Sequence, residues 1–391
     1  MKEDIKIIIL NKNGEIVSSN NQYESYTFDS QYNMVADAFS VTLVDNKQDI
    51  ERGYGIQLLI NNIVEFNGII QCKERNVEKN DHGITLSGKD RAGILVEGYC
   101  HTFTDYNNTL PKTIIDDLID QTNFYTKQKG TANESVDSTG FNDSGDVSNH
   151  NSTLLSDVNS NDTLSSTTDV TIYDTEFTAL SAIKHFKISP GETVYDKINQ
   201  LVVSQGYEIL YQENGTLYVG NLNKKRYADS VVYSIVFRED GRGNNVLSSN
   251  LIDDESGRYS TISITSQSED YQYSATKPSV NVEKIATDST LGTVKYFAQN
   301  INDNEGSPEK IAVRIREDQR IAGYQLRYEV PGHVAENGHA WRVNRYVNIY
   351  DDINDIMENL VLYGRTFEFS RSTGTRTLLR LSHERSDQLT L

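Results

Sequence analysis

Two of the seven histidines, His333 and His339, are candidate metal ligands because they stand close together in a segment that contains two glycines. Their spacing of six residues fits neither one face of a helix nor a zinc ribbon. We interpret the segment as a solvated loop, with a metal site as the alternative.

Three aspartates, Asp351, Asp352 and Asp355, resemble the start of a calcium-binding loop. An EF-hand also needs a glycine at its sixth position for the turn and a glutamate at its twelfth position as bidentate ligand. Ile356 and Leu362 occupy those positions here. The pattern therefore predicts a turn that connects two strands.

Trp341 is the only tryptophan of the chain and stands just before a predicted strand. One interpretation is a ring on which a ligand stacks. The favoured interpretation is a half-buried plug at the edge of a β-barrel, with the indole N–H hydrogen-bonded.

Motifs that would define an enzyme are missing, since no GxSxG, P-loop or GxGxxG sequence is present. The two carboxylates of a glycosidase are defined by their separation in space and not by their spacing in sequence. The chain has 56 acidic residues, any two of which could form such a pair, so a hydrolase stays open as a third hypothesis. Its mark would be turnover that is lost when a specific carboxylate pair is mutated. We expect no enzyme, no catalytic, cofactor-binding or metal-ligating residues, and no cofactor.

The charge balance is strongly acidic, with 37 Lys and Arg against 56 Asp and Glu and a formal net charge of −19. Affinity for nucleic acid comes largely from Lys and Arg that displace counterions, so the chain should repel DNA. The densest basic cluster, Arg314, Arg316 and Arg320, is interleaved with Glu317 and Asp318. That pattern predicts a solvated or subunit-facing ion network.

The sequence also predicts the cellular compartment in which the chain is made. Residues 1–4 lack the basic region of a signal peptide, and no apolar run approaches the roughly 20 residues that span a bilayer. We expect a soluble chain made in a cytoplasm. Cys72 and Cys100 have no CxxC spacing, and we interpret both as small buried thiols, with a disulfide as the alternative.

The two ends of the chain carry the same order of short segments in which residues alternate between two faces. The first half has them at 26–28, 39–43, 56–60, 63–71 and 83–87, and the later half at 246–247, 259–264, 347–349, 360–369 and 376–381. Alternation at period two between Asn, Asp and Gly turns indicates half-buried antiparallel strands. The repeated order predicts one β-barrel design used twice.

Helices are predicted between the two β regions. One opens at Pro111 and places its apolar residues on one face. Another is predicted to start with Ser189 as N-cap and Pro190 at the first position, and to end at Gly206. The unit expected is a helix packed on a hairpin of strands 207–211 and 216–219.

Two further segments have a polar composition. Residues 131–183 contain no Lys or Arg and are rich in Ser, Thr, Asn and Asp, so they bury too little apolar surface to fold alone. We expect a peripheral element held by neighbouring chains of an assembly, whose deletion impairs that assembly. Residues 266–325 are expected to contain two or three strands, including 311–315.

Five segments, in this order, resemble the baseplate hub protein of contractile phage tails such as phage Mu, and more distantly the hub half of the type VI secretion spike. They are 86–96 (LSGKDRAGILV), 186–219, 245–247 with 258–260, 338–344 (GHAWRVN), and 360–381. Together they cover most of the chain, and none is diagnostic alone. The departure is 125–185, where the family has a short connection.

The resemblance implies a homotrimer whose two barrels per chain form a six-fold-like ring, so that a six-fold tail tube meets a three-fold central spike. Implied partners are the spike protein, the tube or tube-initiator protein and other baseplate proteins, without specific nucleic-acid binding or membrane insertion. The implied location is the tail baseplate of a virion assembled in the bacterial host cytoplasm. Phage, bacteriocin and other injection devices all stay open.

The sequence thus predicts a mainly β fold with α+β parts, in which two similar antiparallel β-barrels are linked by helix-plus-hairpin elements. The expected regions are 1–104 (first barrel), 105–227 (helix, insert at 125–185, helix–hairpin unit), 228–265 plus 326–391 (second barrel) and 266–325 (inserted β segment). The function expected is a structural hub of a contractile tail or injection particle. The rival is a carbohydrate-binding or adhesin-like β protein, which quenching of Trp341 fluorescence by glycans would favour.

Overall fold

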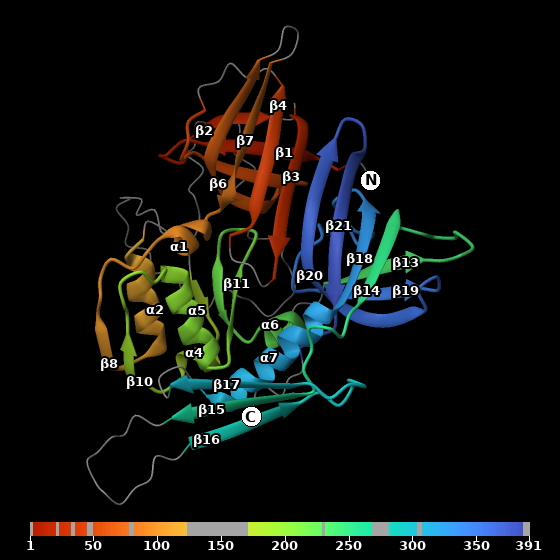
Figure 1. Cartoon of the computed structure of the whole chain (residues 1–391). Helices are drawn as coiled ribbons and strands as arrows, with labels where there is room; N and C mark the ends of the chain where they lie inside the picture. Colours follow the sequence, from red (N-terminus) through yellow and green to blue (C-terminus); the bar gives the residue numbers. More distant parts are fainter. Residues whose placement is uncertain are drawn as a thin grey trace, which may run out of the picture.

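A large twisted sheet runs through the molecule, with a mixed α/β part on one side and a small sheet beside a long helix below it (Figure 1). The computed structural model describes residues 3–20, 23–32, 36–44, 50–77, 82–122, 171–228, 231–267, 281–302 and 307–385. The mainly β class with α+β parts that the sequence predicts is confirmed.

The first half of the chain supplies seven strands of the large sheet, which we call the first β unit. Its strands are β1 (Ile5–Leu10), β2 (Ile16–Asn20), β3 (Tyr23–Gln31), β4 (Ala38–Val44), β5 (Gly55–Ile60), β6 (Ile63–Val77) and β7 (His82–Asp90). β3, β4, β7, β6, β5, β1 and β2 lie side by side in that order. Alternate side chains such as Phe39, Val41 and Leu43 of β4 enter the core.

The later half supplies six strands, which we call the second β unit. They are β13 (Val232–Phe237), β14 (Ser248–Asp253), β18 (Tyr324–Pro331), β19 (Tyr346–Asp351), β20 (Ile356–Ser370) and β21 (Gly374–Ser382). β14, β18, β21, β20 and β19 lie side by side in that order, and β13 follows β19. The first unit has the same order in β3, β4, β7, β6, β5 and β1.

The likeness of the two units extends to their irregularities. β6 and β20 are each 15 residues long. Each has one extra residue that shifts its register against the next strand, Gln71 in β6 and Tyr363 in β20. One difference is that β13 runs parallel to β19, whereas β1 runs antiparallel to β5.

The expectation of two similar antiparallel β-barrels needs correction in one respect, the closure of each barrel. In the described residues the strands of neither unit pair into a closed ring, and β3 of the first unit pairs with β20 of the second. The two units therefore share one sheet of 13 strands. A strand edge that would be exposed in each unit alone is covered by the other unit.

Residues 259–264, expected in the second barrel, lie in a different sheet. That sheet contains β15 (Thr261–Gln267), β16 (Asn281–Thr287) and β17 (Tyr296–Asn302), with β15 in the centre. Ile262 and Ile264 pack in a small core of their own. The place beside β14 is taken by β18, whose Leu326 and Tyr328 are fully buried.

The strand expected at 311–315 is a helix. α7 (Pro308–Gly323) packs against β15 and β16. Pro308 suits the first helical turn, where its missing N–H has no partner to lose. Ile311 and Ile315 recur at helical spacing and pack on the core of the small sheet.

The mixed α/β part lies between the two units in sequence. Its elements are α1 (Gly93–Glu97), β8 (Asp105–Thr109), α2 (Pro111–Asp120), β9 (Thr171–Tyr173), α4 (Thr175–Thr178), β10 (Ile183–Lys187), α5 (Val194–Ser204), β11 (Glu208–Tyr211), β12 (Leu217–Gly220) and α6 (Leu222–Ala228). The predicted helix at Pro111 is confirmed, with Ile114, Ile115, Leu118 and Ile119 buried. The hairpin of β11 and β12 is confirmed as well.

The predicted start of α5 is wrong by four positions. Ser189 N–H does donate to Glu192 Oε2 at 2.6 Å, as a capping box requires. Gly191, however, has φ of +92°, which a helix excludes. Thr193 is the N-cap instead, and its Oγ1 accepts from Asp196 N–H at 3.1 Å. The predicted end is confirmed by Gly206 at φ of +79°.

Most of the polar insert, residues 123–170, falls outside the described residues. From Thr171 onward the chain belongs to the fold, because β9 pairs parallel with β12 and Phe177 of α4 is buried. The segment expected to be peripheral therefore ends before Thr171. In the described part of the chain, no helix is both long and apolar enough to cross a membrane.

Candidate functional site: the seam between the two β units

The pairing of β20 with β3, from Gly364–Gln31 to Ser370–Ser25, forms a seam between the two β units. Phe367 lies opposite Phe28, and both rings are buried in a core that takes residues from both units. Beside them, Thr366 Oγ1 donates to Asp29 Oδ1 at 2.7 Å. Backbone, apolar and polar contacts thus hold the units at one fixed angle.

A buried ion network lies next to the seam. Glu65 of β6 is 1% exposed and receives Arg342 Nη2 at 2.7 Å and Arg365 Nη1 at 3.2 Å. Arg365 of β20 is also 1% exposed, and its Nη2 donates to the backbone oxygen of Glu65 at 2.7 Å. The Glu65 carboxylate raises the pKa of Arg342 above its ordinary value. One buried carboxylate of the first unit thus pairs with two guanidinium groups, and Glu213 of the β11–β12 hairpin, 3.9 Å from Arg365 Nη2, adds a second negative charge.

His333 and Trp341 lie in the loop between β18 and β19 that reaches this network. His333 is fully buried, so the solvated-loop interpretation is wrong for this residue. Its Nε2 lies 2.8 Å from Tyr26 Oη and its Nδ1 lies 2.9 Å from Thr377 Oγ1. Burial lowers the pKa of His333 to about 3, so the ring is neutral at pH 7 and bridges two strands. His339, the second candidate, is exposed at the loop tip, where Asn337 Oδ1 accepts from its N–H.

Trp341 is 2% exposed and packs on Tyr233 with 4.7 Å between ring centroids. A ligand cannot stack on a ring with so little exposed surface. The expected hydrogen bond of the indole N–H has no acceptor among the described residues, so that part of the prediction is wrong. Arg365 donates to the Trp341 backbone oxygen instead, which ties the loop to β20.

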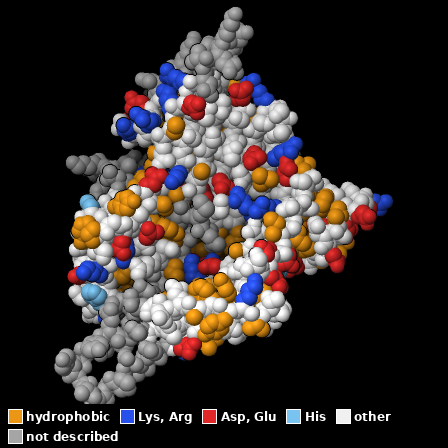
Figure 2. Space-filling model, viewed as in Figure 1, with side chains coloured by type: hydrophobic (Ala, Val, Ile, Leu, Met, Phe, Trp, Pro, Cys, Tyr) orange, Lys and Arg blue, Asp and Glu red, His pale blue; other side chains and the backbone are white. Residues whose placement is uncertain are grey.

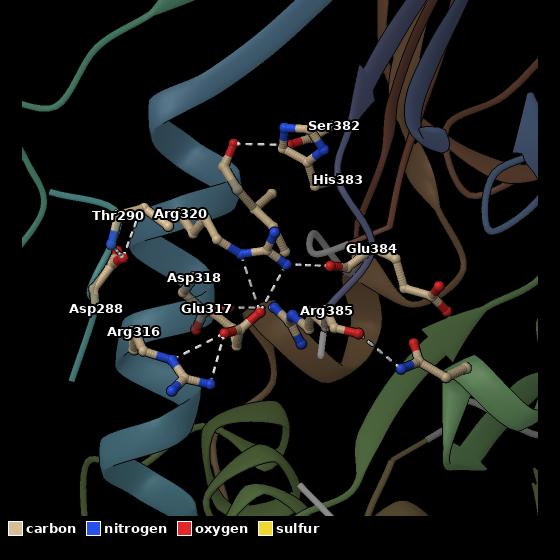
Figure 3. Close-up of polar contacts among 12 residues, drawn as sticks. Asp288, Thr290, Arg316, Glu317, Asp318, Arg320, Ser382, His383, Glu384 and Arg385 are labelled. Carbon is tan, nitrogen blue, oxygen red and sulfur yellow. Dashed lines mark hydrogen bonds and ion pairs between the residues drawn. The ribbon is translucent and has the colours of Figure 1, made fainter. Parts of the chain in front are cut away.

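A second ion network joins α7 to residues 384–385 (Figure 3). Glu317 is 2% exposed and receives Arg316 Nη2 at 2.9 Å and Arg320 Nη2 at 2.8 Å. Arg320 also donates to the Glu384 backbone oxygen, and Arg385 pairs with Asp318. The predicted solvated or subunit-facing network is therefore an internal one, which clamps residues 384–385 onto the helix.

Asp37 and Asp90 form a buried acidic pair where the first β unit meets α1. Asp90 Oδ2 accepts from Asp37 N–H at 3.1 Å, and Asp90 Oδ1 accepts from Gly93 N–H at 3.2 Å. Burial, and then the charge of Asp90, raise the pKa of Asp37 well above its ordinary value. Burial raises the pKa of Asp90 to about 7. The pair holds more protons in the folded chain than in the unfolded chain between about pH 4 and pH 7.

Replacing Asp37 by asparagine should therefore flatten the dependence of stability on pH. In the native protein the free energy of unfolding falls as the pH rises through that window, because the folded pair must lose protons that the unfolded chain has already lost. The amide of D37N keeps an acceptor for Gln31 N–H and removes one charge. We expect D37N to gain about 1–3 kcal/mol relative to wild type between pH 5 and pH 8, measured by urea unfolding. D240N, in an exposed turn, is the control, and an equal gain there would contradict the assignment.

The remaining candidates have structural places. Asp351 Oδ1 accepts from Ile353 N–H at 3.1 Å and Asn354 N–H at 2.9 Å, so the predicted strand-connecting turn is confirmed. Cys100 is buried, but Cys72 is exposed, which corrects that prediction, and both are free thiols. Among the described residues no three His, Cys, Asp or Glu side chains gather around one point. Acidic and basic side chains are interspersed on the face shown in Figure 2.

Comparison with known proteins gives consistent findings. Residues 318–385, which include α7 from Asp318 and the strands β18, β19, β20 and β21, match the NMB1110-like family model described as tail protein, C-terminal domain. The tail protein of Neisseria meningitidis MC58 is 19% identical over 98% of this chain and 97% of its own, with a TM-score of 0.71. Among curated protein sequences none matches.

Two further solved structures share the fold. The 43 kDa tail protein of prophage MuSo2 from Shewanella oneidensis is 16% identical over 98% of each chain, with a TM-score of 0.68. A component of the Escherichia coli type VI secretion system, described as similar in structure to the phage T4 tail proteins gp27 and gp5, is 9% identical over 99% of this chain and 78% of its own, with a TM-score of 0.53. The resemblance drawn from the sequence is thus confirmed for the fold: the chain has the fold of these phage tail proteins, and its residues 318–385 match a tail-protein C-terminal domain.

Proposed function

We propose that this chain is the baseplate hub of a contractile tail or injection particle, in which three copies join a six-fold tube to a three-fold spike. The observation that supports this proposal most directly is the repeated strand order of the two β units, together with the seam that places them side by side. Three chains with two similar units each present six similar surfaces on one ring, while the rest of each chain keeps three-fold symmetry.

Charge and fold support this proposal. A net charge of −19 disfavours phosphate contacts, which suits the wall of a conduit for DNA. The similar type VI secretion component is itself described as related to gp27 and gp5, two tail proteins. Partners proposed on this basis are two further copies, the spike, the tube or tube-initiator protein and other baseplate chains, in a virion assembled in the host cytoplasm.

The carbohydrate-binding alternative has lost its candidate residue, because Trp341 is buried. The matches to structural tail proteins favour a role without catalysis.

Electron microscopy of the purified chain tests the proposal. We expect class averages of a ring with three-fold symmetry, in which six lobes of similar size surround a central opening. Particles without a central opening, or pairs related by a two-fold axis, would contradict the adaptor role.

A further inference from the structure

Strands β6 and β14 of the large sheet each have an edge that no described strand covers. β6 pairs with β7 along residues 68–77, but with β5 only as far as Ile69, so its second half has one open edge in the described structure. β14 pairs with β18 alone among the described strands, so its other edge is open along its whole length. Figure 1 shows β6 and β14 on opposite sides of the molecule.

The seam shows what covers the equivalent edges inside the chain. β20 corresponds to β6. Along one edge of β20, its first half pairs with β19 and its second half pairs antiparallel with β3. β18 of the second unit is equivalent to β4 of the first unit. β14 lies next to β18 and β3 lies next to β4, so β14 corresponds to β3. The open edge of β6 is thus equivalent to the edge of β20 that β3 covers.

The two bulges fix the register of this equivalence. Gln71 and Tyr363 are the extra residues, so Asn76 of β6 corresponds to Glu368 of β20. The registers through β7–β4 and β21–β18 make Thr27 of β3 correspond to Asn250 of β14. Thr27 pairs with Glu368 in the seam. The equivalent pair is Asn76 with Asn250 of another copy, which places Glu74 opposite Ile252.

The backbone groups on both edges are set for this register. Asp90 N–H donates to Asp37 O at 2.7 Å, so the backbone groups of residue 90 point toward β4. By alternation along β7, the backbone groups of residues 87, 85 and 83 point toward β6, where they lie opposite residues 72, 74 and 76. The backbone N–H and C=O groups of residues 73, 75 and 77 therefore point toward the open edge of β6. Asp254 N–H donates to Gly323 O at 2.8 Å, so the groups of 249, 251 and 253 face the open edge of β14. These two sets lie opposite one another in the inferred register.

One pair of side chains supports this register. β14 exposes Leu251 and Ile252, each 37% accessible, on an edge strand, and such an edge is a template for pairing with another chain. Lys73 of β6 comes opposite Asp253 of β14, and Arg75 follows on the same face of β6. Opposite charges directly across a strand pair stabilise the pairing, and Lys73 with Asp253 is such a pair.

We propose that residues 73–77 of β6 pair antiparallel with β14 of a second copy of this chain, in the register that sets Glu74 opposite Ile252. This inference rests on the proposed function, because a head-to-tail contact of this kind closes into a ring when three copies each contribute two equivalent units. The large sheet then continues from chain to chain around the ring.

Cysteine cross-linking of the full chain tests the register. Glu74→Cys and Ile252→Cys, in a Cys72→Ser background that removes the exposed native thiol, would lie in a non-hydrogen-bonded pair with Cα atoms about 4.5 Å apart, within the range a disulfide spans. The matched control is Glu74→Cys with Leu251→Cys, whose side chains leave opposite faces of the sheet. Native mass of the reduced variants checks that assembly is unchanged.

After oxidation we expect covalent dimers and trimers from the Glu74–Ile252 pair on a non-reducing denaturing gel, with trimer as the largest species, and monomer from the control. A native trimer in which the Glu74–Ile252 pair stays monomeric, or in which both pairs link equally, would overturn the inference and leave the proposed hub standing. A wild-type chain that is monomeric in solution would contradict the hub and the inference together.

Discussion

Replacing Arg365 with alanine is expected to lower the free energy of unfolding by about 3–5 kcal/mol, because Glu65 then keeps only Arg342 and the neighbouring Glu213 loses its ion pair. Arg365 and Glu65 are each 1% exposed, so water cannot replace the lost partner without opening the core. The change also removes a donor to the Glu65 and Trp341 backbone oxygens. Urea unfolding followed by the fluorescence of Trp341 measures the loss.

The control for this prediction is R371A. Arg371 follows β20 directly, its side chain is 61% exposed, and it lies 3.9 Å from Glu24. Exposed pairs of this kind contribute about 0–1 kcal/mol, so R371A should unfold almost as wild type does. Equal losses in R365A and R371A would show that the buried network does not hold the two units together.

Replacing Glu317 with alanine should cost about 2–3 kcal/mol, since it leaves Arg316 and Arg320 without their shared carboxylate in a mostly buried place. Arg320 also holds residue 384, so the end of the described chain should detach from α7. Limited proteolysis should then cut after 382 faster than in wild type, and urea unfolding should give the loss in stability.

E309A is the matched control on the same helix. Glu309 is 47% exposed, and its oxygen lies 3.5 Å from Lys284 Nζ. We expect a change below about 0.5 kcal/mol and no faster cleavage. If E309A and E317A behave alike, the network in Figure 3 contributes nothing to the attachment of the C-terminal segment.

The sequence predicted the elements whose pattern is local. Alternating apolar residues marked the strands of both units, and the stripe from Ile114 to Ile119 marked α2. Assignments that depend on distant partners failed. Residues 259–264 show the alternation of apolar and polar residues that is typical of a strand. They are nevertheless outside the large sheet, because β18 pairs with β14 in the position expected for them, and β15 pairs with β16 instead.

The candidate site was less predictable than the strands. A signal for the buried network exists in the sequence, because Glu65 interrupts the apolar run of β6 and Arg365 interrupts that of β20. Which charge faces which depends on the seam, and the paired residues Glu65 and Arg365 are 300 positions apart. Glu317 looked exposed for the same reason, since its burial comes from residues 384–385, far along the chain.

The native mass of the purified full chain tests the central proposal most directly. A chain of 44.1 kDa that assembles as proposed should give about 132 kDa, three times the monomer mass, by light scattering. A mass that stays at 44.1 kDa as the concentration is raised, or that settles at twice this value, would contradict a trimeric hub built from two β units per chain.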